Sequence, residues 1–306
     1  MPDFVIAVSG LKMSYRDVEA LRGIDLDVRA GEVFAFLGPN GAGKTTTVEI
    51  LEGFRHRTGG EVSVLGEDPA NAGASWRARI GVVLQECQPE PELTVWECLS
   101  LYATYYPRAR PVRETLELVG LADRTAVRCG HLSGGQRRRL DVALALIGDP
   151  ELLFLDEPTT GFDPSARRSA WEVIAGLRGL GKTIFLTTHY MEEAEYLADR
   201  VAVITKGSMV ARGAPEAIGE RSKMASTIRF RLPATVTAKD LPAPVMASIV
   251  AADNGRVEAK AANPLPLLGL LAAWAGDQGF DIADLEVSHP TLEDTYLELT
   301  EEASRV

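Results

Sequence analysis

A glycine-rich loop between an apolar strand and a helix places the strongest constraint on the fold of this chain. Residues 32–37 predict a continuous apolar strand, and the run Gly-Pro-Asn-Gly-Ala-Gly-Lys-Thr follows directly at residues 38–45. The run matches the pattern G-x-x-x-x-G-K-S/T, in which glycines let backbone N–H groups turn inward around phosphate oxygens. A helix that begins near Gly43 adds partial positive charge at its N-terminus. The pattern therefore predicts a phosphate-binding loop in an α/β protein.

The side chains of this loop predict a site for a nucleotide and its metal ion. Lys44 is expected to reach the β- and γ-phosphates, and the Thr45 hydroxyl is expected to bind Mg²⁺. The predicted nucleotide contacts in this segment are Gly38, Pro39, Asn40, Gly41, Ala42, Gly43, Lys44, Thr45 and Thr46.

A pair of carboxylates is predicted at the end of a second buried strand. Residues 152–155 are apolar, as in a strand of a parallel sheet, and Asp156 and Glu157 follow them. A carboxylate at this strand end would lie beside the phosphates. We therefore expect Asp156 to hold Mg²⁺ through water.

Strands alternate with helices over much of the first 220 residues, which predicts a parallel sheet covered on both faces. Residues 4–8 and 24–28 alternate apolar and polar side chains, as in strands with one wet face. A further strand pair is expected at residues 61–65 and 80–84.

A helical segment interrupts this alternation. Residues 87–149 carry almost no strand signal, and Thr94 with Glu97 forms a capping-box pattern at the start of an apolar helix. We interpret residues 87–149 as a helical subdomain inserted into the α/β core.

The pattern changes after Pro215. Residues 227–232 alternate as in an edge-type strand, residues 253–255 form a hairpin turn signal, and residues 265–275 predict a helix. The chain is therefore divided into a domain at 1–220 and a small α+β domain at 221–306.

Composition excludes some classes of protein. The formal net charge of −11 argues against a general nucleic-acid binder, which needs a basic face. The three cysteines, Cys87, Cys98 and Cys129, have no metal-ligand spacing and are expected to be reduced thiols. No signal peptide is visible, and the longest apolar run, residues 265–275, falls short of the roughly 20 residues of a membrane helix.

The order of three motifs resembles the ATP-binding cassette (ABC) family. Between the glycine-rich loop and the acidic strand end lies Leu-Ser-Gly-Gly-Gln at residues 132–136, and the resemblance covers about residues 3 to 220. It implies the P-loop NTPase core of the ABC type, with an antiparallel β subdomain and the inserted helical subdomain. It also implies that Ser133, Gly134, Gly135 and Gln136 bind the γ-phosphate held by a second subunit, since a hydroxyl, backbone amides and a helix start form an anion site.

The same resemblance assigns roles to five further residues. Glu157 would polarise the attacking water, and His189, after the strand at 183–187, would touch the γ-phosphate and orient water and glutamate. Gln85 would be the Q-loop residue that meets Mg²⁺ or water. Asp163 would be the D-loop residue at a dimer interface, and Tyr15 would supply the aromatic ring that stacks on adenine. We interpret residues 137–139, three arginines, as a solvated helix face that adds a phosphate-attracting field.

The resemblance implies that the chain is an ATPase subunit on the cytoplasmic face of a bacterial cell membrane. It would close with a second ATP-binding subunit, most simply a copy of itself, over two ATP and Mg²⁺, and drive a separate transmembrane permease without binding nucleic acid. Residues 289–300 resemble the ending of drug-resistance and antibiotic-export ATPases. The alternative is a soluble ABC ATPase that acts on ribosomes or nucleic acid. A regulatory module without turnover would be expected to lack Glu157 or His189, and both are present.

Overall fold

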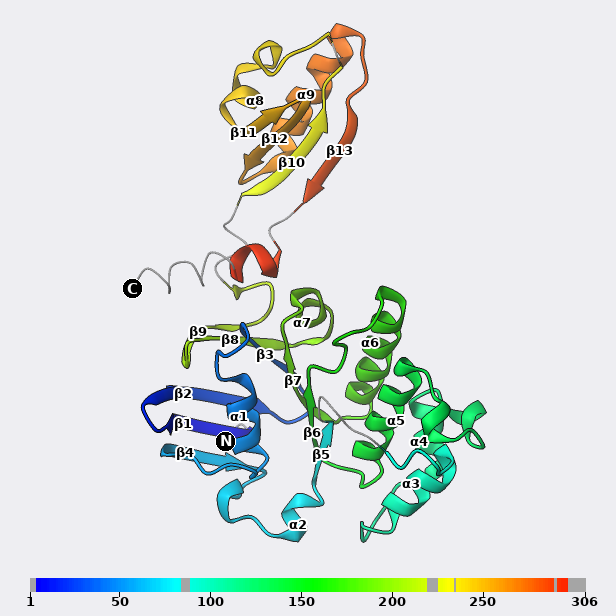
Figure 1. The fold of residues 1–306 in the computed structure, drawn as a ribbon. Coiled ribbons are helices and arrows are strands. Elements are labelled where there is room, and N and C mark those ends of the chain that lie inside the picture. Colours follow the sequence, from blue (N-terminus) through cyan, green and yellow to red (C-terminus); the bar gives the residue numbers. More distant parts are fainter. Residues whose placement is uncertain (1–3, 84–88, 219–224, 234, 289–290, 297–306) are drawn as a thin grey trace. The chain divides into compact units, whose positions relative to one another are not determined.

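The computed structural model describes residues 4–83, 89–218, 225–233, 235–288 and 291–296 (Figure 1). Its internal contacts divide the described residues into two compact units, one up to Pro215 and the other beginning at Glu216. No helix in these described segments is long and apolar enough to cross a membrane.

A six-stranded sheet forms the centre of the first unit, with the order β5-β6-β7-β3-β8-β9. The first five strands in this order run parallel, and β9 pairs with β8 in the antiparallel direction. The strands are β3 Val33–Leu37, β5 Ile80–Val83, β6 Leu152–Asp156, β7 Thr183–Thr188, β8 Arg200–Thr205 and β9 Ser208–Gly213.

A second, antiparallel sheet has the order β2-β1-β4, with strands β1 Phe4–Tyr15, β2 Val18–Arg29 and β4 Gly59–Val64. The predicted pairing of residues 61–65 with 80–84 is wrong. Strand β4 pairs with β1, whereas β5 pairs in parallel with β6 of the larger sheet. The segment between β4 and β5 is too long for a tight hairpin and holds short helices, so the chain crosses from one sheet to the other.

Helices cover the larger sheet and build the inserted helical block (Figure 1). In the described part of the block, residues 89–149, no strand is present beyond one isolated bridge, and the predicted capping box of Thr94 and Glu97 is confirmed. The helices are α1 Lys44–Leu51, α2 Ala74–Arg77, α3 Val95–Ala103, α4 Val112–Leu118, α5 Gly134–Leu146, α6 Pro164–Gly179 and α7 Met191–Leu197.

The main core lies between the two sheets and includes α1. Phe34 and Phe36 of β3 point to this side, where both rings pack against Phe185 of β7 with centroids 5.7 Å apart. All five residues of β3 are buried, as the continuous apolar run predicts. This rigid strand ends at the glycine-rich loop and therefore fixes the position of the loop.

The second unit contains a four-stranded antiparallel sheet with the order β11-β12-β10-β13. The prediction of an edge strand at β10 is wrong, because β10 pairs with β12 on one side and with β13 on the other. Its alternating pattern arises because α9 covers only the face that carries Ile228 and Phe230. The elements are β10 Ser226–Arg231, α8 Ala243–Ala247, β11 Ile249–Asp253, β12 Arg256–Ala261, α9 Pro264–Gln278 and β13 Ala283–Ser288.

Candidate functional site

The glycine-rich loop is packed so tightly at two positions that only glycine fits. A Cβ at Gly38 would lie 2.4 Å from the Ile204 carbonyl oxygen. Gly43 has φ +112°, and a Cβ there would lie 2.7 Å from Leu21 Cδ2. Both glycines therefore let the loop pass close to neighbouring strands, and the positive φ of Gly43 turns the chain into α1.

Lys44, the first residue of α1, is buried beneath this loop. Its Nζ donates to the Gly38 carbonyl oxygen at 2.8 Å and to the Pro39 carbonyl oxygen at 3.4 Å. Burial lowers the pKa of the ammonium from its ordinary value, while Glu157 and Asp156 act in the opposite direction. A phosphate in this loop would meet a buried cation held in place by the loop itself.

The two carboxylates at the end of β6 are oriented by β7. Asp156 is the register partner of Thr187, whose hydroxyl donates to Asp156 Oδ1. The backbone N–H of Glu157 lies 3.1 Å from both the carbonyl and the hydroxyl oxygen of Thr187. Thr187 belongs to none of the predicted site residues; its one signal in the sequence is its place near the end of an apolar strand, two residues before His189.

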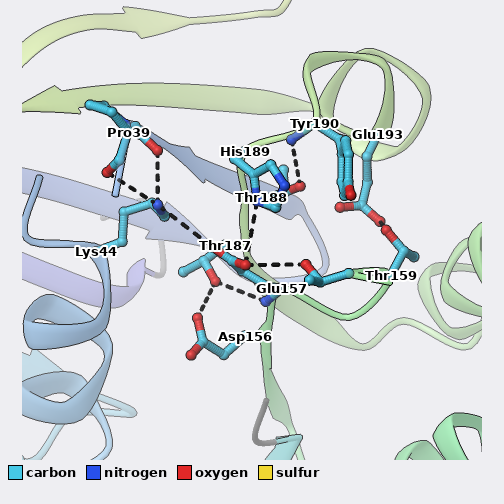
Figure 2. A network of polar contacts seen from close by, with 12 residues as sticks. Pro39, Lys44, Asp156, Glu157, Thr159, Thr187, Thr188, His189, Tyr190 and Glu193 are labelled. Atoms are coloured by element: carbon cyan, nitrogen blue, oxygen red, sulfur yellow. Dashed lines mark hydrogen bonds and ion pairs between the residues drawn. The ribbon is translucent and has the colours of Figure 1, made fainter. Parts of the chain in front are cut away.

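Glu157 lies between a lysine and a histidine (Figure 2). Its Oε1 lies 3.7 Å from Lys44 Nζ, its Oε2 lies 3.3 Å from His189 Nδ1, and the Thr160 hydroxyl donates to Oε2 at 3.1 Å. The backbone of Glu157 has φ +44°, a conformation that non-glycine residues rarely adopt. The structure therefore brings the three residues predicted as catalytic together in one network.

The predicted adenine-stacking residue is connected to the same loop. Tyr15 ends β1, and its hydroxyl lies 3.3 Å from the hydroxyl oxygen of Thr46. The Arg55 guanidinium lies 5.0 Å from the centre of the Tyr15 ring, which is 37% exposed. Thr45, the predicted metal ligand, is exposed beside them. An aromatic surface is thus available next to the phosphate loop.

The Ser-Gly-Gly-Gln run forms a separate surface. Ser133 caps α5 by accepting a hydrogen bond from the Gln136 N–H at 3.3 Å, and the Gln136 side chain accepts one from the Ser133 N–H at 3.0 Å. Asp163 caps α6 through the N–H groups of two residues at 2.9 and 3.0 Å. Both caps line one hollow of about 620 Å³ together with Gly134 and Gly135.

This hollow is separate from the phosphate loop: among the described residues, no hydrogen bond or ion pair joins Ser133–Gln136 to Gly38–Thr45. The predicted site residues therefore fall into two groups on one chain. Gln85 lies outside the described residues, so its position is not part of this geometry.

The reading of residues 137–139 as a solvated arginine face is wrong for Arg138. Arg137 is exposed, but the Arg138 side chain is only 11% exposed and its guanidinium faces backbone carbonyls at the end of β6. The helical turn that begins at Ser133 directs this one arginine inward. A run of three equal residues contains no signal that distinguishes the inward position from the other two.

Oxygen donors dominate the candidate metal position. Asp156 and Thr45 supply a carboxylate and a hydroxyl, the ligand types that suit Mg²⁺. Within the described segments, no group of three or more His, Cys, Asp or Glu side chains could hold a metal ion. These donors fit a Mg²⁺ ion whose remaining ligands are phosphate oxygens and water.

Comparisons with known proteins agree with this geometry. Residues 21–160 match the family described as ABC transporter, and residues 226–291 match the ABC transporter domain-containing protein-like, C-terminal domain. Nod factor export ATP-binding protein I of Burkholderia pseudomallei (strain 1710b) is 40% identical, over 94% of this chain and 93% of its own length. Daunorubicin resistance ATP-binding protein DrrA3 of Streptomyces coeruleorubidus is 36% identical, over 100% of this chain and 99% of its own.

A solved structure shares the fold. The dimeric structure of MJ0796, a bacterial ABC transporter cassette, has a TM-score of 0.61 and 25% identity, over 68% of this chain and 98% of that chain. The protein belongs to the ABC transporter family, which confirms the resemblance and the predicted P-loop fold. It is an ATP-binding subunit of an ABC transporter and hydrolyses ATP.

Proposed function

We propose that this chain powers the export of a drug-like, antibiotic or lipid-like substrate through a separate transmembrane subunit at the cytoplasmic face of the cell membrane. The names of two relatives that align over nearly their whole length, one in Nod factor export and one in daunorubicin resistance, support export. These relatives favour transport over action on ribosomes or nucleic acid, as does the net charge of −11.

The contacts of Glu157 are the single observation that carries the catalytic proposal. Its carboxylate is the group that polarises the attacking water, because it lies beside both Lys44 and His189. Lys44 stabilises charge on the transferred phosphate, and His189 orients the carboxylate and the γ-phosphate. Tyr15 provides the ring on which adenine stacks, an interaction worth about 1–3 kcal/mol.

Mg²⁺ completes the proposed site. Thr45 and Asp156 would hold it, with Gln85 as a further ligand, and the ion would neutralise charge on the β- and γ-phosphates. The Thr187 hydroxyl keeps the Asp156 carboxylate in one orientation, so the metal position is prepared before the nucleotide binds.

The second group of site residues acts on a partner subunit. Ser133, Gly134, Gly135 and Gln136 bind the γ-phosphate held by another copy of this chain, with Asp163 nearby at the interface. The separation of this surface from the chain's own phosphate loop supports a site shared between two subunits. ATP then joins the subunits, and hydrolysis removes the bridging γ-phosphate. We propose that the domain from about residue 221 is an accessory brace or regulator.

A variant that binds ATP without hydrolysing it tests this proposal. Glu157→Gln is expected to retain ATP while turnover falls about 10²–10⁴-fold, since it removes general-base assistance. Light scattering after size exclusion should then show a dimer with Mg·ATP and a monomer with Mg·ADP.

Two controls make the result specific to the proposed interface. Adding Ser133→Arg to Glu157→Gln should restore the monomer while ATP binding persists, whereas Ser208→Arg, at the exposed first residue of β9, should leave the dimer intact. A monomer in saturating Mg·ATP at high protein concentration would rule out a homodimer, and near-normal hydrolysis by Glu157→Gln would show that the base lies elsewhere.

A further inference from the structure

Arg138 holds the backbone on which the proposed catalytic carboxylate is mounted. Its Nε donates to the Pro158 carbonyl oxygen at 3.0 Å, and its Nη2 donates to the carbonyl oxygens of Asp156 at 3.0 Å and Glu157 at 3.4 Å. A planar guanidinium presents these donors in a fixed fork, which a lysine ammonium cannot reproduce. One side chain from α5 therefore contacts three consecutive carbonyl groups at the end of β6.

These bonds act on a strained residue. Glu157 has φ +44°, and such a conformation persists only where the surroundings determine it at more than one point. Thr187 binds the Glu157 N–H, and Arg138 binds the Glu157 carbonyl oxygen. The peptide groups on both sides of the Glu157 Cα are thus fixed, which directs the carboxylate toward Lys44 and His189.

The helix that carries Arg138 begins at the Ser-Gly-Gly-Gln surface. Helix α5 starts at Gly134 with Ser133 as its cap, and residues 140–146 of the helix are buried. Arg138 lies five residues beyond Ser133, which is roughly 7–8 Å along a helix that rises about 1.5 Å per residue. A small movement at the start of α5 therefore reaches the guanidinium within about one and a half turns.

We propose that Arg138 is a positioning residue that holds Glu157 of its own chain in working geometry and makes that geometry depend on the start of α5. The inference rests on the proposed function, in which Ser133 binds nucleotide on the partner. ATP held by the partner would then order α5 in this chain and, through Arg138, the carboxylate at this chain's own site. Ser133 acts on the partner's site, whereas Arg138 acts on its own.

Mixed dimers distinguish this role from a merely structural one. The reference dimer pairs a Glu157→Gln chain with a wild-type chain, each purified by its own affinity tag, so that one defined site turns over. Arg138→Gln in the chain that keeps Glu157 is expected to lower kcat about 10–100-fold, with the KM for ATP within about twofold of the reference. The same change placed in the Glu157→Gln chain should give a kcat equal to that of the reference dimer.

Two outcomes overturn the inference. If Arg138→Gln lowers kcat equally in either chain of the mixed dimer, Arg138 only supports the shape of α5. If it leaves kcat unchanged in the chain that keeps Glu157, Arg138 does not position that carboxylate. Arg137→Gln in the chain that keeps Glu157 is the matched control, because Arg137 is exposed on the same helix and its charge would act only on the partner's nucleotide; kcat should equal that of the reference dimer.

The proposed function fails separately. If the reference dimer does not form in Mg·ATP, the proposal of a shared site is wrong. The positioning role of Arg138 is then tested with protein in which every chain carries Arg138→Gln. Its kcat should still fall with an unchanged KM, and a kcat equal to that of Arg137→Gln would overturn the positioning role.

Discussion

Replacing Thr187 by valine tests whether β7 prepares the metal position. Valine keeps the shape of threonine but removes the hydroxyl that donates to Asp156 Oδ1. The Glu157 N–H keeps its bond to the Thr187 backbone carbonyl at 3.1 Å, so the strand end should remain folded. A hydrogen bond to a charged group contributes about 1.5–3 kcal/mol, which corresponds to roughly 10–150-fold in an equilibrium constant.

The assay is ATP hydrolysis as a function of Mg²⁺ concentration. The concentration for half-maximal rate should rise about 10-fold or more in Thr187→Val, because Asp156 is no longer held in one orientation. Thr183→Val is the matched control: Thr183 is buried at the other end of β7, and its hydroxyl accepts from the Gly31 N–H at 3.0 Å. An unchanged Mg²⁺ dependence in Thr187→Val, or an equal shift in Thr183→Val, would refute the reasoning.

Two further predictions concern stability and follow from burial and backbone geometry. Burial, with Asp156 and Glu49 nearby, raises the pKa of Glu52 to about 8, compared with 4.5 for the unfolded chain. The contribution of this carboxyl to stability is therefore fully present below pH 4.5 and is lost as the pH rises through about 8. Thermal unfolding without nucleotide should show Tm falling over this window in wild type and less in Glu52→Gln; parallel curves would contradict it. Gly43→Ala should lower Tm more than Gly41→Ala, since both have positive φ but only a Cβ at Gly43 meets atoms within 4 Å; equal Tm values would contradict the close approach.

Local sequence patterns predict those parts of the site that are formed by residues from one continuous segment of the chain. The glycine spacing at Gly38–Thr45 and the apolar strand ending at Asp156 and Glu157 identify their chemistry because strand, loop and helix follow one another directly. The resemblance to known motifs supplied His189, which the structure places 3.3 Å from Glu157.

Contacts that depend on register and helix rotation could not be predicted in the same way. Thr187 reaches Asp156 because β6 and β7 are paired in one register, and Arg138 reaches three carbonyls because α5 is rotated to face them. Neither choice leaves a mark in a single sequence. How the sheets assemble likewise decides that β4 pairs with β1, that β5 pairs with β6 and that β10 lies inside its sheet.

Complementation between two inactive variants tests the shared site most directly. Lys44→Ala removes the buried cation of the phosphate loop, and Ser133→Arg blocks the surface offered to the partner, so each protein alone should lose hydrolysis. In a mixed dimer, the Ser133→Arg chain keeps an intact phosphate loop and the Lys44→Ala chain keeps an intact Ser133, which together complete one site. We predict that mixing the two restores ATP hydrolysis well above either variant alone. A mixture that stays inactive, although mixed dimers are recovered through a different affinity tag on each chain, would contradict a site shared between two chains.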